Sequence, residues 1–162
     1  ILIMMLYVIT SLSHILYYLI WNYPYDFIFF AYDCSVTPVT LMSSLSYIQK
    51  ILQFLFIIYY SVINNTLIPY FENLNILNIL FIGIGQTLNL SVYYKLGTKG
   101  VYYGNKFGLQ LPYITTFPYN IGINNPQYIG CILTLCGLYP LVSLNYVIYA
   151  STLYHITMYI EN

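Results

Sequence analysis

Four long apolar stretches, separated by segments rich in Asn, Gly and Pro, dominate the hydropathy pattern of the chain. They predict helices over residues of about 1–20, 46–63, 74–94 and 127–160. A helix rises about 1.5 Å per residue, so roughly 20 residues are needed to cross a bilayer core. The last stretch is interrupted by Pro140, and only the part after this proline is long enough to cross. The pattern predicts an all-α polytopic integral membrane protein.

The segments between the apolar stretches are expected to be loops. Residues 22–45 contain Pro24 and Pro38, which we interpret as helix breakers. Residues 95–126 form the most polar stretch, and their many Gly and Pro residues indicate a defined backbone shape rather than a flexible linker. We expect one domain over residues 1–162.

Composition supports a membrane protein and excludes several other classes. Hydrophobic residues make up 60% of the 162 residues and charged residues only 5%, against about 25% charged in soluble domains. A net charge of +0 without an arginine-rich stripe argues against nucleic-acid binding. The three cysteines, together with His14 and His155, lack the spacing of a metal site, so no metal is expected. We expect both histidines to be satisfied interior residues.

The four lysines suggest how the chain is oriented. Three of them lie in the 95–126 loop, which marks this loop as cytoplasmic because cytoplasmic loops are enriched in Lys and Arg. Lys50 is expected in the first turns of the second helix, close to the headgroups on the same side. Residues 22–50 would then be cytoplasmic and residues 64–73 would lie on the far side.

Several short motifs could carry chemistry. Gly83-Ile84-Gly85 lies inside an apolar stretch, where glycine permits close approach by a cofactor or by a neighbouring helix. Asn125-Pro126-Gln127-Tyr128 follows the polar loop, and Glu161 follows the last apolar stretch. Each motif also has an ordinary structural interpretation: helix packing, an interfacial loop and a solvated acid, respectively.

In combination, these motifs resemble the phospholipid N-methyltransferase family. The resemblance is carried by GIGQTLNLSVYYKLGTKGVYYGNKFG, LPYITTFPYN and NNPQYIGCILTLCG, in which GxG, YxG, FPxN and NPxYxG follow in order. It extends from Gly83 to about Glu161, and SLSYIQKILQF and WNYP are similar to earlier family segments. The resemblance implies a multi-pass enzyme, of the endoplasmic reticulum or another internal membrane such as the mitochondrial one, that uses S-adenosylmethionine to methylate the amine of phosphatidylethanolamine derivatives.

The resemblance also implies a set of cofactor-binding residues: Gly83, Ile84, Gly85, Asn125, Pro126, Tyr128, Ile160 and Glu161. The family has a Glu-Glu pair after the last helix, and Ile160 takes the place of its first acid. We expect Glu161 to bind the cofactor rather than act as the base. Asn125 and Tyr128 are candidates for orienting the reacting amine, and the sequence offers no obvious base.

A cytosolic cofactor constrains the last apolar segment. If residues 127–160 crossed the bilayer once, Glu161 would emerge far from Asn125 and Tyr128. We therefore predict a re-entrant helical hairpin with its bend near Leu138–Leu141, which makes four to five membrane-embedded helices in all. The partners implied are ethanolamine phospholipids as substrate, while the oligomeric state stays open.

Two other functions remain possible from the sequence. A relative that methylates prenylated cysteine carboxylates shares the NPxY-type element, and a small non-enzymatic subunit of a membrane complex would have the same composition. A transporter or channel should carry ionisable groups inside its spans, whereas here we expect none apart from His14 and His155.

Overall fold

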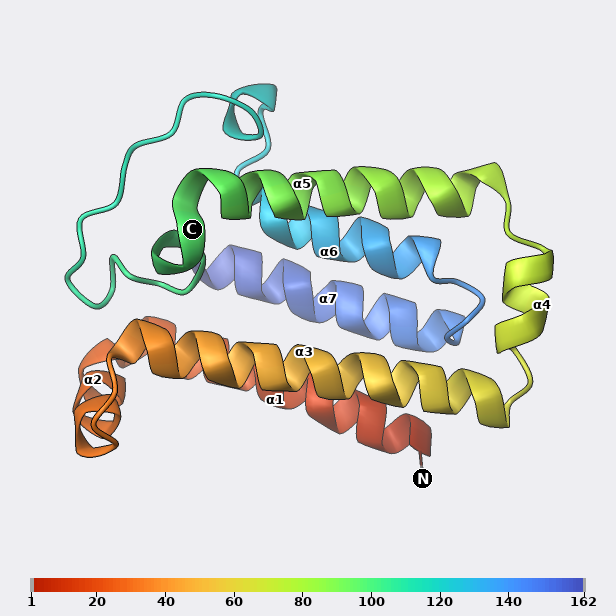
Figure 1. The fold of residues 1–162 in the computed structure, drawn as a ribbon, viewed down its shortest axis with the longest axis horizontal. Coiled ribbons are helices and arrows are strands. Elements are labelled where there is room, and N and C mark those ends of the chain that lie inside the picture. The colour runs from red at the N-terminus through yellow and green to blue at the C-terminus, as the bar shows by residue number, and fades with distance from the viewer. Residues whose placement is uncertain (1, 162) are drawn as a thin grey trace.

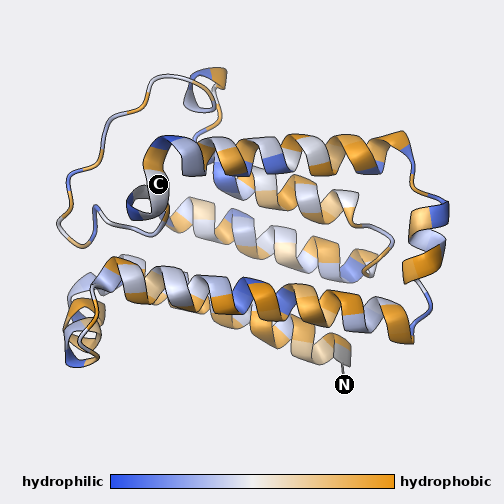
Figure 2. Ribbon diagram, viewed as in Figure 1, coloured by the Kyte–Doolittle hydropathy of each residue, from blue (hydrophilic) through white to orange (hydrophobic). Residues whose placement is uncertain are grey.

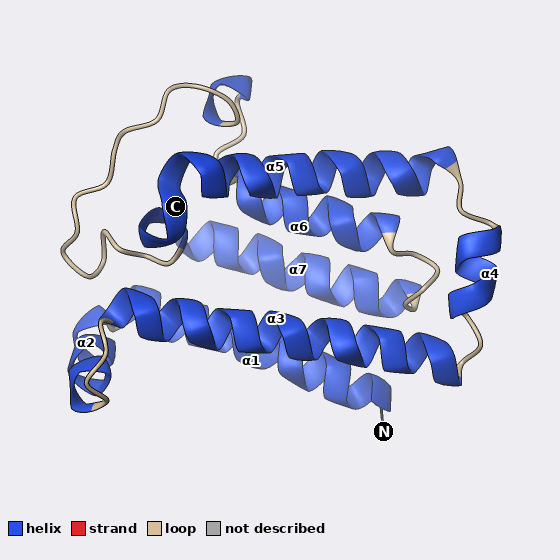
Figure 3. Ribbon diagram, in the orientation of Figure 1, coloured by secondary structure: helices blue, strands red, loops and turns tan. Residues whose placement is uncertain are grey.

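The computed structural model describes residues 2–161, and all regular structure among them is helical (Figure 3). This confirms the predicted fold class. The elements are α1 (Leu2–Asn22), α2 (Pro24–Asp33), α3 (Pro38–Ile63), α4 (Leu67–Glu72), α5 (Ile76–Val101), the 3-10 turn η1 (Tyr119–Ile121), α6 (Pro126–Gly137) and α7 (Leu144–Glu161).

Three of the helices are long and apolar enough to cross a membrane: Ile3–Asn22 of α1, all of α3 and all of α5. Their outward faces carry large exposed apolar side chains, such as Leu12, Phe54 and Leu80, and hydrophobic positions run along the whole length of these helices (Figure 2). Such surfaces are unfavourable in water and suit contact with lipid chains.

The helices lie side by side, so the connecting segments gather at two ends of the molecule (Figure 1). One end holds α2, the loop of residues 102–125 and the C-terminal end of α7. The other holds α4 and the turn of residues 138–143. Side chains from the first end therefore come together although they are far apart in the sequence.

The expected loop over residues 22–45 is wrong, because this segment forms α2 and the first two turns of α3. Pro24 and Pro38 both occupy the start of a helix. Proline is favoured there, since its fixed φ suits the helix and its missing N–H would be unpaired in any case. The Thr37 side chain also accepts a hydrogen bond from the Thr40 N–H, which caps α3.

The earlier start of α3 also corrects the placement of Lys50. This residue lies in the middle of the 26-residue helix, not in its first turns. Its Nζ lies 5.9 Å from the ring centroid of Tyr93 and 5.8 Å from that of Tyr102. Contrary to the sequence-based expectation, a spanning helix thus carries an ionisable side chain in its interior.

The third predicted helix is shifted toward the C-terminus. It begins at Ile76, where Asn75 and Asn78 form a reciprocal capping box, and it continues to Val101 rather than ending at residue 94. Gly97 permits the continuation, because its φ of +61° kinks the chain in a conformation that favours glycine. The irregular loop is correspondingly shorter than expected and covers residues 102–125, interrupted by η1.

Residues 126–161 form two helices, α6 and α7, that pack against each other and are joined by the turn of residues 138–143. The predicted bend near Leu138–Leu141 lies in this turn. Tyr70 Oη and Asn78 Nδ2 both donate to the Gly137 carbonyl, at 2.8 and 2.9 Å, and hold the turn against α4 and α5. The re-entrant placement of this hairpin in a bilayer stays a prediction.

Candidate functional site

A carboxylate cluster joins three separate segments at the end of the molecule that holds the C-terminus. Tyr128 from the first turn of α6 donates its hydroxyl to Glu161 Oε1 at 2.7 Å, and Tyr103 from the loop donates to the same oxygen. The two tyrosine hydroxyls lie 3.1 Å apart. The hairpin thus brings Glu161, at the end of α7, back beside the NPxY segment.

The local backbone explains how Tyr103 reaches this cluster. Tyr103 has a φ of +56°, and the following Gly104 donates its N–H to the Lys99 carbonyl at 2.8 Å. A left-handed residue immediately after a helix reverses the chain sharply. The reversal turns the Tyr103 ring inward against Trp21 of α1, at a centroid distance of 5.3 Å.

A cavity opens beside this cluster, under the 102–125 loop. Its lining includes Trp21 of α1, Tyr119, Asn125 and Tyr128, together with Glu161. These residues provide a carboxylate, an amide, phenol hydroxyls and aromatic faces within one hollow. Such a set can accept hydrogen bonds from hydroxyl and amino groups and can surround a cation with aromatic rings.

The electrostatics of the cluster are set by burial. Burial raises the pKa of Glu161 above its usual range, while the hydrogen bonds from Tyr103 and Tyr128 and the charge of Lys106 act in the opposite direction. Burial and the neighbouring Glu161 also raise the pKa of Tyr103, so its hydroxyl remains a neutral donor. Glu161 is therefore not an ordinary solvated acid.

The GxG motif lies away from this cavity. Gly83 and Ile84 line a separate apolar hollow between α5 and the segment of residues 117–133. Gly85 instead contacts α6, where a methyl group added to it would lie 2.6 Å from the Gly130 carbonyl oxygen and 2.5 Å from Thr134 Oγ1. Gly85 thus allows the close approach of α5 and α6, which is the packing role considered in the sequence analysis.

The remaining expected residues fall on either side of Glu161. Asn125 and Pro126 line the same cavity as Glu161 and Tyr128. Ile160 points into a neighbouring groove between α1 and α7, which Glu161 also lines. Because this groove is mostly apolar, an isoleucine at position 160 suits its surroundings better than a second acid would.

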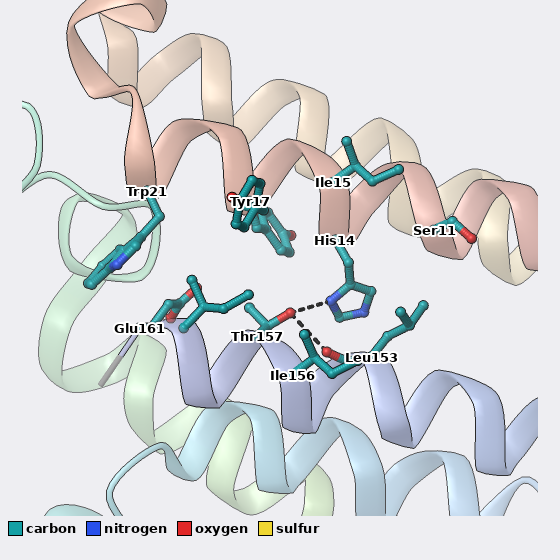
Figure 4. Close-up of a pocket in the computed structure, with 11 residues that line it drawn as sticks. Ser11, His14, Ile15, Tyr17, Trp21, Leu153, Ile156, Thr157 and Glu161 are labelled. Carbon is teal, nitrogen blue, oxygen red and sulfur yellow. Dashed lines mark hydrogen bonds between the residues drawn. The ribbon is translucent and has the colours of Figure 1, made fainter.

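This second hollow, here called the α1–α7 groove, is shown in Figure 4. Its lining residues are Ser11, His14, Ile15, Tyr17, Tyr18, Trp21, Leu153, Ile156, Thr157, Ile160 and Glu161. His14 is buried and its Nδ1 lies 2.7 Å from Thr157 Oγ1, which confirms the expectation of a satisfied interior histidine. For His155 the expectation is wrong, because its side chain is exposed and its Nδ1 lies 2.8 Å from the Ser151 carbonyl of its own helix.

Sequence reasoning missed three residues of the site: Trp21, Tyr103 and Lys106. Lys106 places its Nζ 3.6 Å from the centroid of the Trp21 ring, where the cavity and the groove meet. Tyr103 belongs to the YxG motif, which was noted only as part of the family resemblance. No sequence signal connects Trp21 to a segment more than 80 residues later, because their proximity arises from the packing of α1 beside the loop.

Comparison with known proteins gives a consistent family assignment. The sequence profile of the family described as phospholipid methyltransferase matches residues 73–161. Phosphatidyl-N-methylethanolamine N-methyltransferase of Arabidopsis thaliana is 35% identical over 127 residues, which cover 77% of this chain and 71% of the relative.

Other relatives match over shorter regions. Phosphatidyl-N-methylethanolamine N-methyltransferase of Saccharomyces cerevisiae is 43% identical over 68 residues, covering 41% of this chain and 32% of the relative. Phosphatidylethanolamine N-methyltransferase A of Dictyostelium discoideum is 39% identical over 59 residues, covering 36% and 27%. No solved structure gives a significant match.

Proposed function

The chain belongs to the phospholipid methyltransferase family, and from this premise we propose that it transfers a methyl group from S-adenosylmethionine to the amine of an ethanolamine phospholipid. The observation that carries the proposal is the Glu161 cluster. The hairpin brings a half-buried carboxylate beside the NPxY segment and next to a cavity with amide and aromatic walls. The step leads toward phosphatidylcholine.

The residues around this cavity fit the cofactor. Glu161 can accept hydrogen bonds from ribose hydroxyls or from the amino group of the methionine part, and Asn125 offers amide groups in the same hollow. The rings of Trp21 and Tyr128 can lie against the sulfonium, where a cation–π contact contributes about 0.5–2 kcal/mol. Ile160 faces the neighbouring groove, so we assign the acidic function of the family's Glu-Glu pair to Glu161 alone.

Gly83, Ile84 and Gly85 enter the proposal in two different ways. Gly85 sets the spacing between α5 and α6, and so determines where Tyr128 stands. Gly83 and Ile84 line a hollow of their own. We propose that these two residues contact the cofactor from this hollow, and the Gly83→Leu variant tests this contact.

The chain must also present the amine in its neutral form, because an alkylammonium with a pKa of about 10 is not nucleophilic. When bound, S-adenosylmethionine supplies a methyl group on a cationic sulfur; its transfer forms a C–N bond and leaves the C–S electron pair on sulfur. Burial among Trp21, Tyr103 and Tyr128 disfavours the charged ammonium and lowers its pKa, so that it gives its proton to solvent water before the neutral amine attacks. Positioning at roughly 3–3.5 Å then provides most of the acceleration.

We propose phosphatidyl-N-methylethanolamine as the main acceptor, as in the name of the plant relative. The protein is proposed to reside in the endoplasmic reticulum, with the loop of residues 102–125 and the adjoining end of α5 facing the cytoplasm. A glycosylation tag inserted in this loop should then stay unmodified, whereas a tag near Asn65 should be modified, as read by a gel shift. The reverse pattern would contradict the orientation.

A labelling experiment tests the function. Membranes containing the protein are incubated with methyl-labelled S-adenosylmethionine and with ethanolamine phospholipids of each methylation state, and the labelled lipids are identified. Label in a phospholipid one methylation step beyond the one added supports the proposal. Label in an added prenylcysteine substrate, or in no product at all, would contradict it. Membranes lacking the protein provide the background.

A further inference from the structure

The cofactor cavity and the α1–α7 groove meet at two residues. Trp21 and Glu161 line both hollows, and Figure 4 shows them at one end of the groove, with Ser11 and Leu153 toward the other. A molecule that lies in the groove with its end at Trp21 therefore reaches the cavity in which we place the cofactor.

The groove has the character of a lipid-chain site over most of its length. Its sides include Ile15 and Tyr18 of α1 and Leu153 and Ile156 of α7, and Ile15, Tyr18 and Ile156 are exposed at the surface of the bundle. Two of its polar groups are already engaged, since His14 bonds to Thr157 and, toward the far end, Ser11 bonds to Tyr149. An acyl chain can therefore lie there without leaving a buried polar group unpaired.

The mouth of the groove has the opposite character. Glu161 lines it with a negative side chain, and beside it the positive Lys106 places its Nζ 3.6 Å from the centroid of the Trp21 ring, which also lines the groove. The charge of Lys106 also lowers the pKa of Glu161, against the effect of burial. A zwitterionic headgroup also carries one charge of each sign, with a phosphate and an amine separated by only two carbons.

We propose that the α1–α7 groove is the binding site of the acceptor phospholipid, with an acyl chain between Ile15 and Ile156, the phosphate at Lys106 and the amine beside Glu161 and Trp21. The inference rests on the proposed function and adds to it the route by which the lipid enters from the bilayer. The Lys106 ammonium over Trp21 occupies the place proposed for the substrate amine, so Lys106 turns toward the phosphate when the lipid binds.

A different groove provides the competing route. The α3–α5 groove is lined by Lys50, Gln53, Gln86, Asn89, Leu90 and residues of α6 and α7. It shares neither Trp21 nor Glu161 with the cofactor cavity. Lys50 could pair with a phosphate there, but the amine would then lie outside the cavity that holds Glu161.

Bulky substitutions distinguish the two routes. Ile156→Trp fills the α1–α7 groove, and Leu90→Trp fills the α3–α5 groove. Ile148→Trp is the control, because Ile148 lies on the same helix as Ile156, is similarly exposed (56% against 50%) and lines neither groove. Kinetics are measured with purified protein and phosphatidyl-N-methylethanolamine in mixed micelles. We expect Ile156→Trp alone to raise the KM for lipid roughly tenfold or more, the effect of losing about 1.4 kcal/mol of binding.

The KM for S-adenosylmethionine should stay near the wild-type value in all three variants. An unchanged KM for this cofactor also shows that each variant is folded. If Ile156→Trp behaves like Ile148→Trp, or if Leu90→Trp gives the larger increase in lipid KM, the α1–α7 groove is not the lipid site. Both results require an active wild-type protein. Failure of the proposed function would appear differently, as absence of labelled lipid with the wild-type protein.

The proposed contact between Lys106 and the lipid phosphate can be tested without placing a bulky side chain in the groove. Lys106→Met should raise the lipid KM roughly tenfold, in line with the loss of one charge-assisted contact, and Lys106→Arg should restore it. Lys99→Met, at an exposed lysine near the same end, is the control. An equal effect of Lys106→Met and Lys106→Arg, or none in either, would contradict the phosphate contact.

Discussion

The two helices of the C-terminal hairpin face very different neighbours. On one face α6 closes against α5 through glycines: a methyl group on Gly85 would meet the Gly130 carbonyl, and one on Gly137 would meet Asn78 and Ile82. On the other face α7 meets α1 through large side chains and hydroxyl contacts, such as the 2.9 Å contact between Thr10 Oγ1 and Tyr146 Oη.

The two contacts therefore have different roles: the α5–α6 contact packs helices, and the α1–α7 contact borders the proposed site. The α5–α6 contact is the most extensive between any two helices of the described chain, and it leaves no space for a ligand at Gly85. The α1–α7 contact leaves a groove that ends at Glu161. The tight face holds Tyr128 in position, and the open face admits the substrate. The predictions below test this division of labour.

The largest expected effect is a loss of stability at the tight face. Gly85→Leu places a bulky side chain against the α6 backbone, and overpacking of this kind destabilises a protein by about 1–3 kcal/mol. Gly83→Leu should change stability little, because no atom lies within 4 Å of the position of the added carbon. Thermal unfolding in detergent, followed by circular dichroism, measures both variants.

The same pair of variants tests the role of the GxG motif in cofactor binding. If Gly83→Leu retains its melting temperature but loses affinity for S-adenosylmethionine, Gly83 contacts the cofactor and the motif does more than pack helices. If Gly85→Leu unfolds like the wild type, the close approach of α5 and α6 does not contribute the stability that we assign to it.

At the open face, cofactor affinity should depend on pH through Glu161. Burial raises the pKa of this carboxyl, and the charged form accepts the proposed hydrogen bonds more strongly than the protonated form does. The affinity for S-adenosylmethionine should therefore be present above the raised pKa and fall as the pH falls through it. Titration calorimetry over a pH series measures this, and Glu161→Gln should remove the dependence.

Stability of the free protein should change with pH in the opposite sense. A carboxyl whose pKa is raised by folding favours the folded state in its protonated form, so its contribution is present below the unfolded pKa and is lost as the pH rises through the folded pKa. Parallel rather than opposite changes of affinity and stability would show that another group dominates.

The smallest effect is expected in the α3–α5 groove. Lys50→Met removes the cation–π contacts with Tyr93 and Tyr102, which contribute about 0.5–2 kcal/mol. It also removes a charge from the middle of a spanning helix, so the two effects partly cancel. We expect a small shift in melting temperature and an unchanged lipid KM. A clear rise in the lipid KM would instead indicate that the lipid phosphate binds at Lys50 and not at Lys106.

Much of this organisation was accessible from the sequence. The apolar stretches predicted the helical membrane fold, and the motif order led to Asn125, Tyr128 and Glu161, which the structure brings to one cavity. The boundaries near Pro24 and Pro38 were wrong because proline can begin a helix as well as end one. This error displaced Lys50 to a helix end and concealed a charged residue inside a span.

The remaining errors concern contacts between distant segments. A glycine in a helix has the same appearance in sequence whether it approaches a ligand or another helix, so Gly85 could not be assigned before its distance to Gly130 was known. Tyr103 reaches Glu161 through a left-handed turn, and Trp21 reaches both hollows through the packing of α1. Neither arrangement leaves a periodic pattern in the sequence.

The most direct test of the account is the affinity of the purified protein for S-adenosylmethionine after removal of a single charge. A hydrogen bond to a charged partner contributes about 1.5–3 kcal/mol, so Glu161→Gln should weaken binding roughly ten- to hundredfold. Glu72→Gln, at an exposed acid at the opposite end, should not weaken it. Unchanged affinity in Glu161→Gln, or equal losses in both variants, would contradict a cofactor site at Glu161.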